Sequence, residues 1–570
     1  MTASYDTVIR GGHIVDGSGS PGFEGDLGIR NGLIAAVGRV EGVAAEEIDA
    51  RGLLVTPGFV DVHTHYDGQA TWDNRLQPSS LHGVTTAVMG NCGVGFAPCK
   101  PGDHERLIRL MEGVEDIPFP VLAEGLPWNW ESFPDYLDGL ASRSFDIDVA
   151  AQLPHAALRV FVMGERGAAR EPATPNDIAA MSVLAEQAMH AGAIGFSTSR
   201  TLNHRTSDGQ PTPTLTAAED ELAGIAQGLK RAGKGVLQVV SDFSDFNNEF
   251  AMLTRLMESS GRPLSFSTAQ SGRAPGAWRM MLERLEVAVK SGLPMKAQVC
   301  GRPVGLLLGL ELTLNPFSYH AAFAEIAGLP LAQKVAKLQD PAFRAGLLAE
   351  EFRWNGPLGR DTFGNWSAMF PMVKGFDYEP TPDQSLAALA AQRGISPLEA
   401  SLDVMLENEG RGMIYLPFLN YADGSLDPSF AMMGHKDTAP GLSDGGAHVG
   451  MICDGSFPTS NLVHWTRDRS RGERFSIEAV VKMQTSTTAR MMGLNDRGLL
   501  QPGLRADINL IDYEGLNLEL PEVVYDLPAG GRRLTQKARG YRATLVAGQV
   551  TYRDGEPTGA LPGRLVRAGA

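Results

Sequence analysis

The sequence is short of cysteine, of basic charge and of long apolar runs. Its 570 residues include four irregularly spaced cysteines, which excludes a disulfide framework and favours a reduced, cytoplasmic protein. Lys and Arg number 50 against 66 Asp and Glu, so the net charge is −16 and nucleic acid is not the expected partner. The longest apolar stretch, residues 304–312, is too short to span a bilayer, and no signal peptide is visible. We therefore expect no association with a membrane.

The composition is otherwise that of a packed globular chain. Hydrophobic residues make up 43% and charged residues 20%, which excludes wholesale disorder. A chain of this length fits either three to four domains or one large α/β barrel with additions. The order of predicted strands and helices decides between these two possibilities.

Both ends of the chain have the pattern of β-strands. Residues 4–55 alternate in two-residue fashion and are interrupted by glycine, and the same pattern returns from about residue 499. Two β-rich ends that flank a long middle predict one small β-sandwich assembled from both termini.

The middle of the chain alternates between apolar strand-like runs and helical patterns. The strand-like runs are residues 59–65, 85–91, 147–154, 193–198, 235–240, 263–268, 294–300 and 439–443. Residues 215–232 and 176–192 have the clearest helical periodicity. Eight strands with helical crossovers predict the α/β class and a closed, TIM-like (β/α)8 barrel.

These patterns predict the division of the chain into domains. We assign residues 1–55 and 491–570 to the two parts of the β-sandwich and residues 56–490 to the barrel. Residues 301–437 are too long for an ordinary connection between strands, so we interpret them as an insertion over the barrel mouth. The alternative is an appendage that does not contact substrate.

The sharpest motif ends the first barrel strand. Residues 56–67 read TPGFVDVHTHYD, so His63 and His65 follow an apolar strand two positions apart. Alternate residues of a strand point to the same face, and the carboxyl ends of barrel strands carry the chemistry. Two imidazoles in this arrangement favour a site for Zn²⁺ or a similar divalent cation, although an isolated HxH also occurs by chance on surface loops.

Four segments together resemble a known family. They are PGFVDVHTH, HGVTTAVMGNCGVGFAPC, LSDGGAHVG and DRGLLQPGLRADINLID. In this order they are similar to the amidohydrolase superfamily, most of all to its D-aminoacylase (N-acyl-D-amino-acid deacylase) branch. The resemblance covers nearly the whole chain. It implies a metal-dependent hydrolase on a (β/α)8 barrel with a β-sandwich built from both termini.

The resemblance also implies roles for single residues. His63 and His65 match the metal ligands of the first strand, and Asp444 matches the aspartate that binds both the metal and the attacking water. Cys92 matches a cysteine that ligates metal in D-aminoacylases, and a thiolate is easily held ionised beside a dication. The alternative for Cys92 is a small buried apolar residue.

The sequence departs from the family pattern at two metal ligands. The family places histidines at the ends of strands five and six, where this chain has Gln238 and Thr268 or a neighbour. No histidine lies between His204 and His320. We therefore predict one zinc ion per chain, held by His63, His65, Cys92 and Asp444. Four protein ligands leave a coordination position for water only if Cys92 binds loosely or the ion becomes five-coordinate.

A third departure concerns the substrate. The family carries an arginine for the substrate carboxylate about a dozen residues after the aspartate, but residues 445–466 contain no Lys or Arg. Arg302 follows a strand end and is our candidate replacement. We also predict substrate contacts for His155 and His204. His448 is a candidate extra ligand or oxyanion donor, with loop packing as the alternative.

The sequence thus predicts a metal-dependent hydrolase that cleaves a carbon–nitrogen amide bond of a small molecule, with Asp444 as general base and acid. A cyclic-amide or ester hydrolase that uses the same site is the first alternative. A barrel that has lost catalysis and serves as a scaffold is the second, although a scaffold has no need of His63, His65 and Asp444. Zinc is the expected cofactor, and a homo-oligomer remains open.

Overall fold

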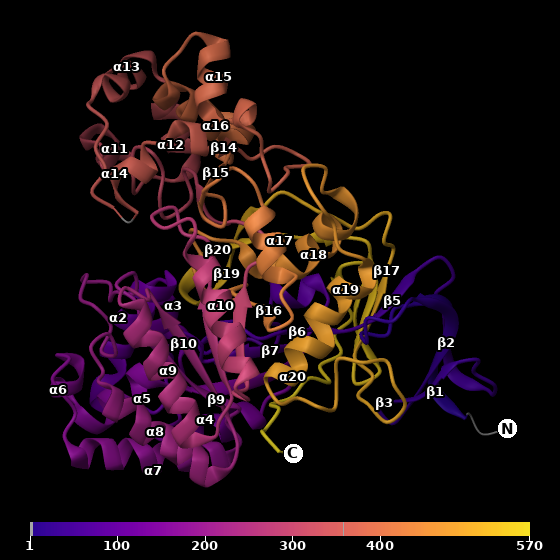
Figure 1. Ribbon diagram of the computed structural model, residues 1–570. Coiled ribbons are helices and arrows are strands. Elements are labelled where there is room, and N and C mark those ends of the chain that lie inside the picture. The colour runs from indigo at the N-terminus through magenta and orange to yellow at the C-terminus, as the bar shows by residue number, and fades with distance from the viewer. Residues whose placement is uncertain (1–3, 357, 570) are drawn as a thin grey trace.

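The computed structural model describes residues 4–356 and 358–569. It contains a parallel barrel, a β-sheet domain formed by both ends of the chain, and an insertion with its own core (Figure 1). Within these residues no helix is both long and apolar enough to cross a membrane.

The eight predicted barrel strands are all present. They are β6 (Phe59–Asp61), β7 (Val84–Met89), β8 (Asp148–Pro154), β9 (Gly195–Arg200), β10 (Val236–Ser241), β11 (Leu264–Thr268), β12 (Met295–Val299) and β16 (Thr438–Pro440). Neighbouring strands pair in parallel from β6 round to β16. The ring closes just beyond the ends of the first and last strands, where Thr64 pairs in parallel with Gly445. The predicted barrel is confirmed.

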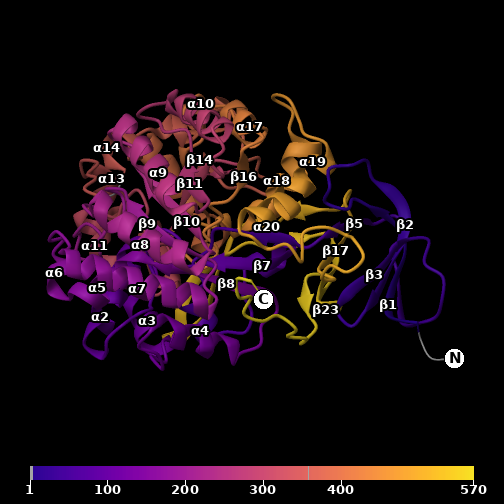
Figure 2. The same cartoon turned by 60° about the horizontal axis from the view of Figure 1, so that its bottom comes forward.

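Helices cover the outside of the barrel, both on the side away from the sheet formed by the chain ends and beside that sheet (Figure 2). They include α2 (His104–Glu115), α3 (Phe119–Gly125), α4 (Phe133–Ala141), α5 (His155–Met163), α7 (Pro175–Ala191), α8 (Glu219–Ala232), α9 (Phe246–Ser260), α10 (Ala277–Lys290), α17 (Asp427–Met433), α18 (Phe457–Val463), α19 (Ile477–Lys482) and α20 (Thr488–Met491). Because strands and helices alternate, the strands are buried on both faces, which is why they appear in sequence as apolar runs.

Local sequence signals set the ends of these helices. Helix α7 begins at a capping box between Thr174 and Asp177 and ends before Gly192, whose φ of 110° suits glycine. Helix α8 begins at Glu219, four residues later than predicted, because residues 212–217 form turns instead. In these turns the Leu215 N–H donates to Thr212 O.

The two ends of the chain build one sheet, here called the terminal β domain. Its strands are β1 (Tyr5–Ile14), β2 (Phe23–Arg30), β3 (Leu33–Gly38), β4 (Ala44–Asp49), β5 (Leu54–Pro57), β17 (Ile508–Ile511), β22 (Tyr541–Val546), β23 (Gln549–Arg553) and β24 (Glu556–Pro557). The N-terminal and C-terminal halves meet where β5 pairs antiparallel with β17. The predicted small β domain from both termini is confirmed.

Two parts of the C-terminal region leave this sheet and lie on the barrel. The hairpin of β19 (Glu522–Leu527) and β20 (Gly531–Thr535) reaches the barrel mouth, where the Leu534 N–H donates to Val449 O. Nearer the C-terminus, Gly563 and Leu565 pair with Phe145 and Val149 at the start of β8. The domain boundaries at residues 55 and 490 stay a prediction.

The insertion contains α11 (Ala321–Ile326), α12 (Leu331–Gln339), α13 (Pro341–Ala349), α14 (Gly359–Phe363), α15 (Leu386–Arg393) and α16 (Pro397–Gly410), with the small sheet β13 (Val304–Leu308), β15 (Ile414–Leu419) and β14 (Phe370–Pro371). Its core continues into Ile452 and Phe457, which follow the last barrel strand. The Leu307 N–H also donates to Met451 O. The insertion is therefore attached to the loop that carries Asp444.

A buried ion network joins the amino end of the barrel to the C-terminal region. Asp148, at the start of β8, is fully buried and accepts from Arg497 at 2.7 Å and from Arg505 at 2.9 Å. Breaking one pair of such a network leaves buried charge without full compensation.

Arg497→Met should therefore lower the free energy of unfolding by about 3 kcal/mol, near the lower limit for buried pairs because Arg505 still reaches Asp148. The thermal midpoint measures this loss. Arg539→Met is the matched control, because Arg539 is exposed and pairs only with Glu519. Equal midpoints for the two variants would contradict a stabilising role for the network.

Candidate functional site

His63 and His65 stand at the point where the barrel closes. They follow β6 on either side of Thr64, and the His65 N–H donates to Gly445 O at 2.8 Å. Both imidazoles are fully buried, and their ring centroids are 5.4 Å apart. The closing hydrogen bonds thus fix two histidines side by side at the carboxyl end of the barrel.

Cys92 joins this pair from the loop after β7. Its Sγ lies 3.2 Å from His63 Nε2, and ligand atoms of Cys92, His63 and His65 all lie within 4.8 Å of one another. The Cys92 backbone has a φ of 54°, which is uncommon for a residue with a side chain. Its N–H donates to Gln238 Oε1 at 3.1 Å, so the glutamine that stands where the family has a histidine holds the cysteine loop.

Asp444 approaches from the opposite side of the closure. It follows β16, and its N–H donates to His63 O. Its Oδ1 lies 3.3 Å from His63 Nε2 and 3.5 Å from His65 Nε2. Like Cys92 it has a positive φ, of 49°. Strained backbone of this kind persists where the surroundings enforce it and is frequent at functional sites.

The other ring nitrogen of each histidine faces an oxygen atom, which for His63 is a hydrogen-bond acceptor. Gln298 Oε1 lies 2.6 Å from His63 Nδ1, and the amide of Gln298 is oriented by its own bond to Ser265 Oγ at 3.1 Å. Glu115 Oε1 lies 3.2 Å from His65 Nδ1. Since an amide oxygen only accepts, the proton of His63 is on Nδ1 and its Nε2 lone pair points into the group.

Electrostatics at this site favour a bound cation. Burial lowers the pKa of His63 to about 4 and raises the pKa of Cys92 to about 11. Burial also acts to raise the pKa of Asp444, but contact with His65 and the charge of His63 hold it well below its usual range. Asp444 Oδ1 has no hydrogen-bond partner among the described residues although it is buried. A divalent cation would stabilise this carboxylate and ionise the thiol.

The donor set fits such a cation. Zinc lies about 2.0–2.3 Å from its nitrogen, oxygen and sulfur ligands, so ligand atoms of a tetrahedral site are about 3.3–3.6 Å apart. The separations of His63 Nε2 from Cys92 Sγ and from Asp444 Oδ1, 3.2 and 3.3 Å, lie at the lower end of this range. Only His63, His65 and Cys92 have ligand atoms that all lie within 4.8 Å of one another among the described residues, so Asp444 would complete the set from slightly farther away. Imidazole, thiolate and carboxylate are all ligands that zinc accepts.

His448, the predicted extra ligand or oxyanion donor, and His204, a predicted substrate contact, lie near this group. His448 Nε2 is 3.9 Å from Asp444 Oδ2, and its ring is partly exposed. His204 accepts or donates at Nδ1 with Ser199 Oγ at 2.9 Å. Burial, followed by the charges of His448 and His65, lowers the pKa of His204 to about 3. Their roles toward substrate stay predictions.

His155 and Arg302, which were also predicted to contact substrate, have partners inside the protein, although Nε and Nη1 of Arg302 have none among the described residues. Both ring nitrogens of His155 have partners at 2.8 Å, Thr198 Oγ1 and Glu221 Oε1, so the buried ring has no nitrogen free for a substrate. Arg302 Nη2 donates to Asp454 Oδ1 at 2.9 Å, and its guanidinium lies 3.9 Å from the centre of the Tyr378 ring. Arg302 is 2% exposed and belongs to an ion pair in the protein interior.

Glu115 and Gln298 also contact the histidines, but neither was predicted from the sequence. Glu115 ends α2, an amphipathic helix with several other acidic residues, and nothing in its sequence context distinguishes it from them. Gln298 lies inside strand β12, where an inward-facing polar residue was the only available signal.

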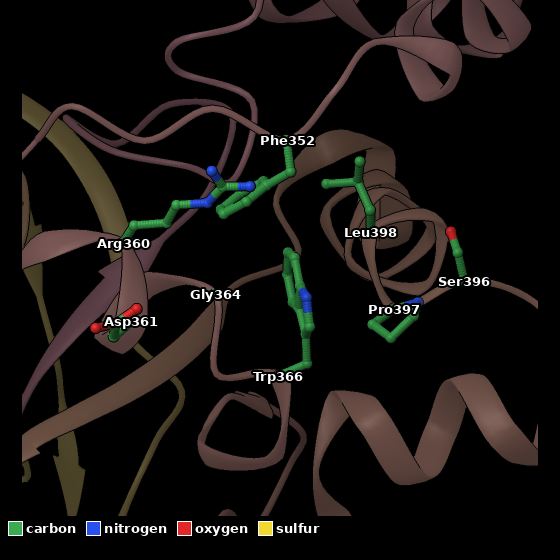
Figure 3. A pocket seen from close by; sticks show the side chains of 8 residues that line it. All are labelled: Phe352, Arg360, Asp361, Gly364, Trp366, Ser396, Pro397 and Leu398. Carbon is green, nitrogen blue, oxygen red and sulfur yellow. The ribbon is translucent and has the colours of Figure 1, made fainter.

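A separate pocket lies in the insertion (Figure 3). It has a volume of about 450 Å³, and the rings of Phe352 and Trp366 stand against Leu398 across it. Its lining contains no histidine or cysteine and shares no residue with the group around His63. This pocket is therefore not the site of metal chemistry.

A closed parallel barrel with two histidines, a cysteine and an aspartate at the carboxyl ends of its strands defines a metal-dependent hydrolase. Residues 46–552 match the amidohydrolase family. The chain belongs to this family, as its motifs predicted, and it is a hydrolase of carbon–nitrogen bonds other than peptide bonds.

Relatives and solved structures extend the likeness over the whole chain. A D-aminoacylase and an N-acyl-D-aspartate deacylase of Alcaligenes xylosoxydans xylosoxydans are each 29% identical, over 99% and 100% of this chain and 97% and 96% of theirs. A D-aminoacylase structure with a binuclear metal centre has a TM-score of 0.66 at 24% identity, covering 99% of this chain and 100% of that one. An N-acyl-D-glutamate deacylase of Bordetella bronchiseptica, complexed with zinc and a phosphonate inhibitor, has a TM-score of 0.65 at 23% identity over the same shares. The resemblance to the D-aminoacylase branch is confirmed.

Proposed function

We propose that this protein hydrolyses the amide bond of an N-acylated amino acid or a similar small molecule at one divalent cation. His63, His65, Cys92 and Asp444 would hold the cation. The observation that carries the proposal is the group of His63, His65 and Cys92, whose ligand atoms lie within 4.8 Å of one another, with Asp444 Oδ1 3.3 Å from His63 Nε2. The deacylase activities of the relatives support the choice of an amide bond.

When bound, a divalent cation lowers the pKa of a coordinated water and polarises the scissile carbonyl. The protein supplies the proton transfers. Asp444 Oδ1 faces His63 and His65, whereas Oδ2 faces His448 and is available to take the proton of the attacking water and return it to the leaving nitrogen. His448 Nε2 is placed to donate to an oxyanion that develops beside Oδ2.

We expect one tightly bound divalent cation per chain. The amide oxygens of Gln238 and Gln298 already accept bonds from Cys92 and His63, and Thr268 Oγ1 donates to Met281. None of these replaces an imidazole as a zinc ligand. A D-aminoacylase that shows one-metal activation and second-metal attenuation supports the sufficiency of a single ion.

Elemental analysis of protein purified without chelator should therefore give a metal-to-chain ratio near one. Protein treated with a chelator and then reloaded with zinc serves as the control for adventitious metal. A reproducible ratio near two would contradict the single site and would point to additional ligands such as His204.

The substrate carboxylate is the open part of this proposal. Two arginines near the strand ends already have carboxylate partners: Arg302 Nη2 pairs with Asp454, and Arg200 pairs with Glu249 at 2.7 Å. Nε and Nη1 of Arg302 have no partner among the described residues. A neutral or cyclic amide, or an ester, is therefore the second candidate class. We keep Arg302 as the candidate for a carboxylate contact, which would require it to share its guanidinium with Asp454.

A substrate panel tests the proposal. Zinc-loaded protein is incubated with N-acyl derivatives of D- and L-amino acids, neutral N-acyl amines, cyclic amides and esters, and product is measured in each case. Release of free amino acid that chelator abolishes and zinc restores is the expected result. Turnover of cyclic amides or esters alone would move the assignment to the second class, and no turnover with full metal content would favour a scaffold.

A further inference from the structure

Glu115 occupies an unusual position beside the candidate metal centre. It is the last residue of α2, in the connection between β7 and β8, and it is 1% exposed. Neither of its carboxylate oxygens makes a hydrogen bond among the described residues. Its nearest titratable neighbours are His65, whose Nδ1 lies 3.2 Å from Oε1, and His448, whose Nε2 lies 3.6 Å from Oε2.

This placement is costly for the fold. A buried carboxylate without hydrogen bonds loses its hydration, and the carboxyl end of a helix repels negative charge. The adjacent Asp116 shows what a structural carboxylate does at the same turn, since it accepts from Gly450 N–H and Thr313 Oγ1, both at 3.0 Å. Glu115 accepts no such hydrogen bonds among the described residues. The cost of burying its carboxylate must therefore be offset by the two histidines and the cation that they would bind.

The backbone ties Glu115 to His448 as well. The His448 N–H donates to the main-chain oxygen of Glu115, and His448 has a φ of 50°. The main-chain oxygen of Glu115 thus accepts from His448, its Oε2 faces the His448 ring, and its Oε1 faces His65.

We propose that Glu115 is a positioning residue that orients a metal ligand and the histidine at the mouth together. One oxygen keeps the proton of His65 on Nδ1, so that Nε2 faces the cation. The other oxygen sets the ring of His448 against Asp444. The inference rests on the proposed function for its metal and adds a residue from α2 that links the centre to residues 444–448.

Glu115→Gln tests this role because it preserves volume and removes the charge. We expect zinc affinity, measured by competition with a chromophoric chelator, to fall about 10–100-fold, as for other outer partners of metal-bound histidines. The thermal midpoint of the metal-free protein should stay the same or rise, because a buried charge is removed. Glu105→Gln is the matched control on the same helix, where Glu105 is exposed and pairs with Arg109.

The outcomes separate this inference from the proposed function. Unchanged zinc affinity, or a lower midpoint of the metal-free variant with normal affinity, would overturn the role of Glu115 whatever the activity. Wild-type protein that binds zinc but hydrolyses no substrate would overturn the proposed function alone. If the variant does not fold, nitrogen-15 histidine spectra of zinc-loaded wild type decide, since a proton on His65 Nε2 instead of Nδ1 contradicts the inference.

Discussion

Asp444→Asn should lower kcat by about 10²–10⁴-fold, the usual contribution of a general base and acid. Asparagine keeps the shape of the side chain and one oxygen toward His63 and His65, but it cannot accept the proton of water. The main-chain bond from the Asp444 N–H to His63 O does not depend on the side chain, so the barrel closure should survive. Steady-state kinetics and the circular dichroism spectrum of the variant check both statements.

The control for this variant is Asp423→Asn. Asp423 accepts from Gln270 Nε2 at 2.6 Å in a loop at the same end of the barrel, but it has no contact with His63 or His65. We expect its kcat to stay near that of the wild type. Near-normal turnover of Asp444→Asn would assign the proton transfer to another residue, with His448 the first to examine.

Cys92→Ser should release the cation more readily while changing the fold little. Loss of an outer partner of a metal ligand costs about 10–100-fold in affinity, so loss of a direct thiolate ligand is expected to cost more. A Cys92 that only fills space would instead give a modest loss of stability and unchanged metal content. Bound metal after dialysis and the thermal midpoint, measured together, distinguish these results.

Cys99→Ser is the matched control for Cys92→Ser. Cys99 is also buried, but its Sγ contacts the Lys100 carbonyl and it is not one of the residues grouped around His63. If both serine variants keep the same bound metal as the wild type, Cys92 is not a ligand.

The barrel could be predicted from sequence because each of its strands is buried on both faces. Strands in that position are rich in apolar residues on both faces, so they stand out between amphipathic helices. His63 and His65 could be predicted equally well, because alternate residues of one extended segment share a face without any long-range contact. Both conclusions depend on local patterns.

The missed parts of the site depend on contacts between distant segments. Glu115 becomes part of the site only because α2 places its last turn beside His65, and an acidic residue near the end of a charged helix gives no sign of this. The ion pair of Arg302 could not be predicted either, because its partner Asp454 lies 152 residues further along the chain. Pairing of that kind is set by the fold and has no signature in either segment.

The closure of the barrel between Thr64 and Gly445 has a consequence for the order in which the protein is made. Strand β6 is synthesised early, but the segment that pairs with it at the closure comes much later. Ser443 in that segment donates to Asp61 and lies 382 residues further along the chain. Until that partner is synthesised, β6 keeps an open edge and the ligand set lacks Asp444. His63, His65, Cys92 and Asp444 can therefore come together only after most of the chain has been synthesised.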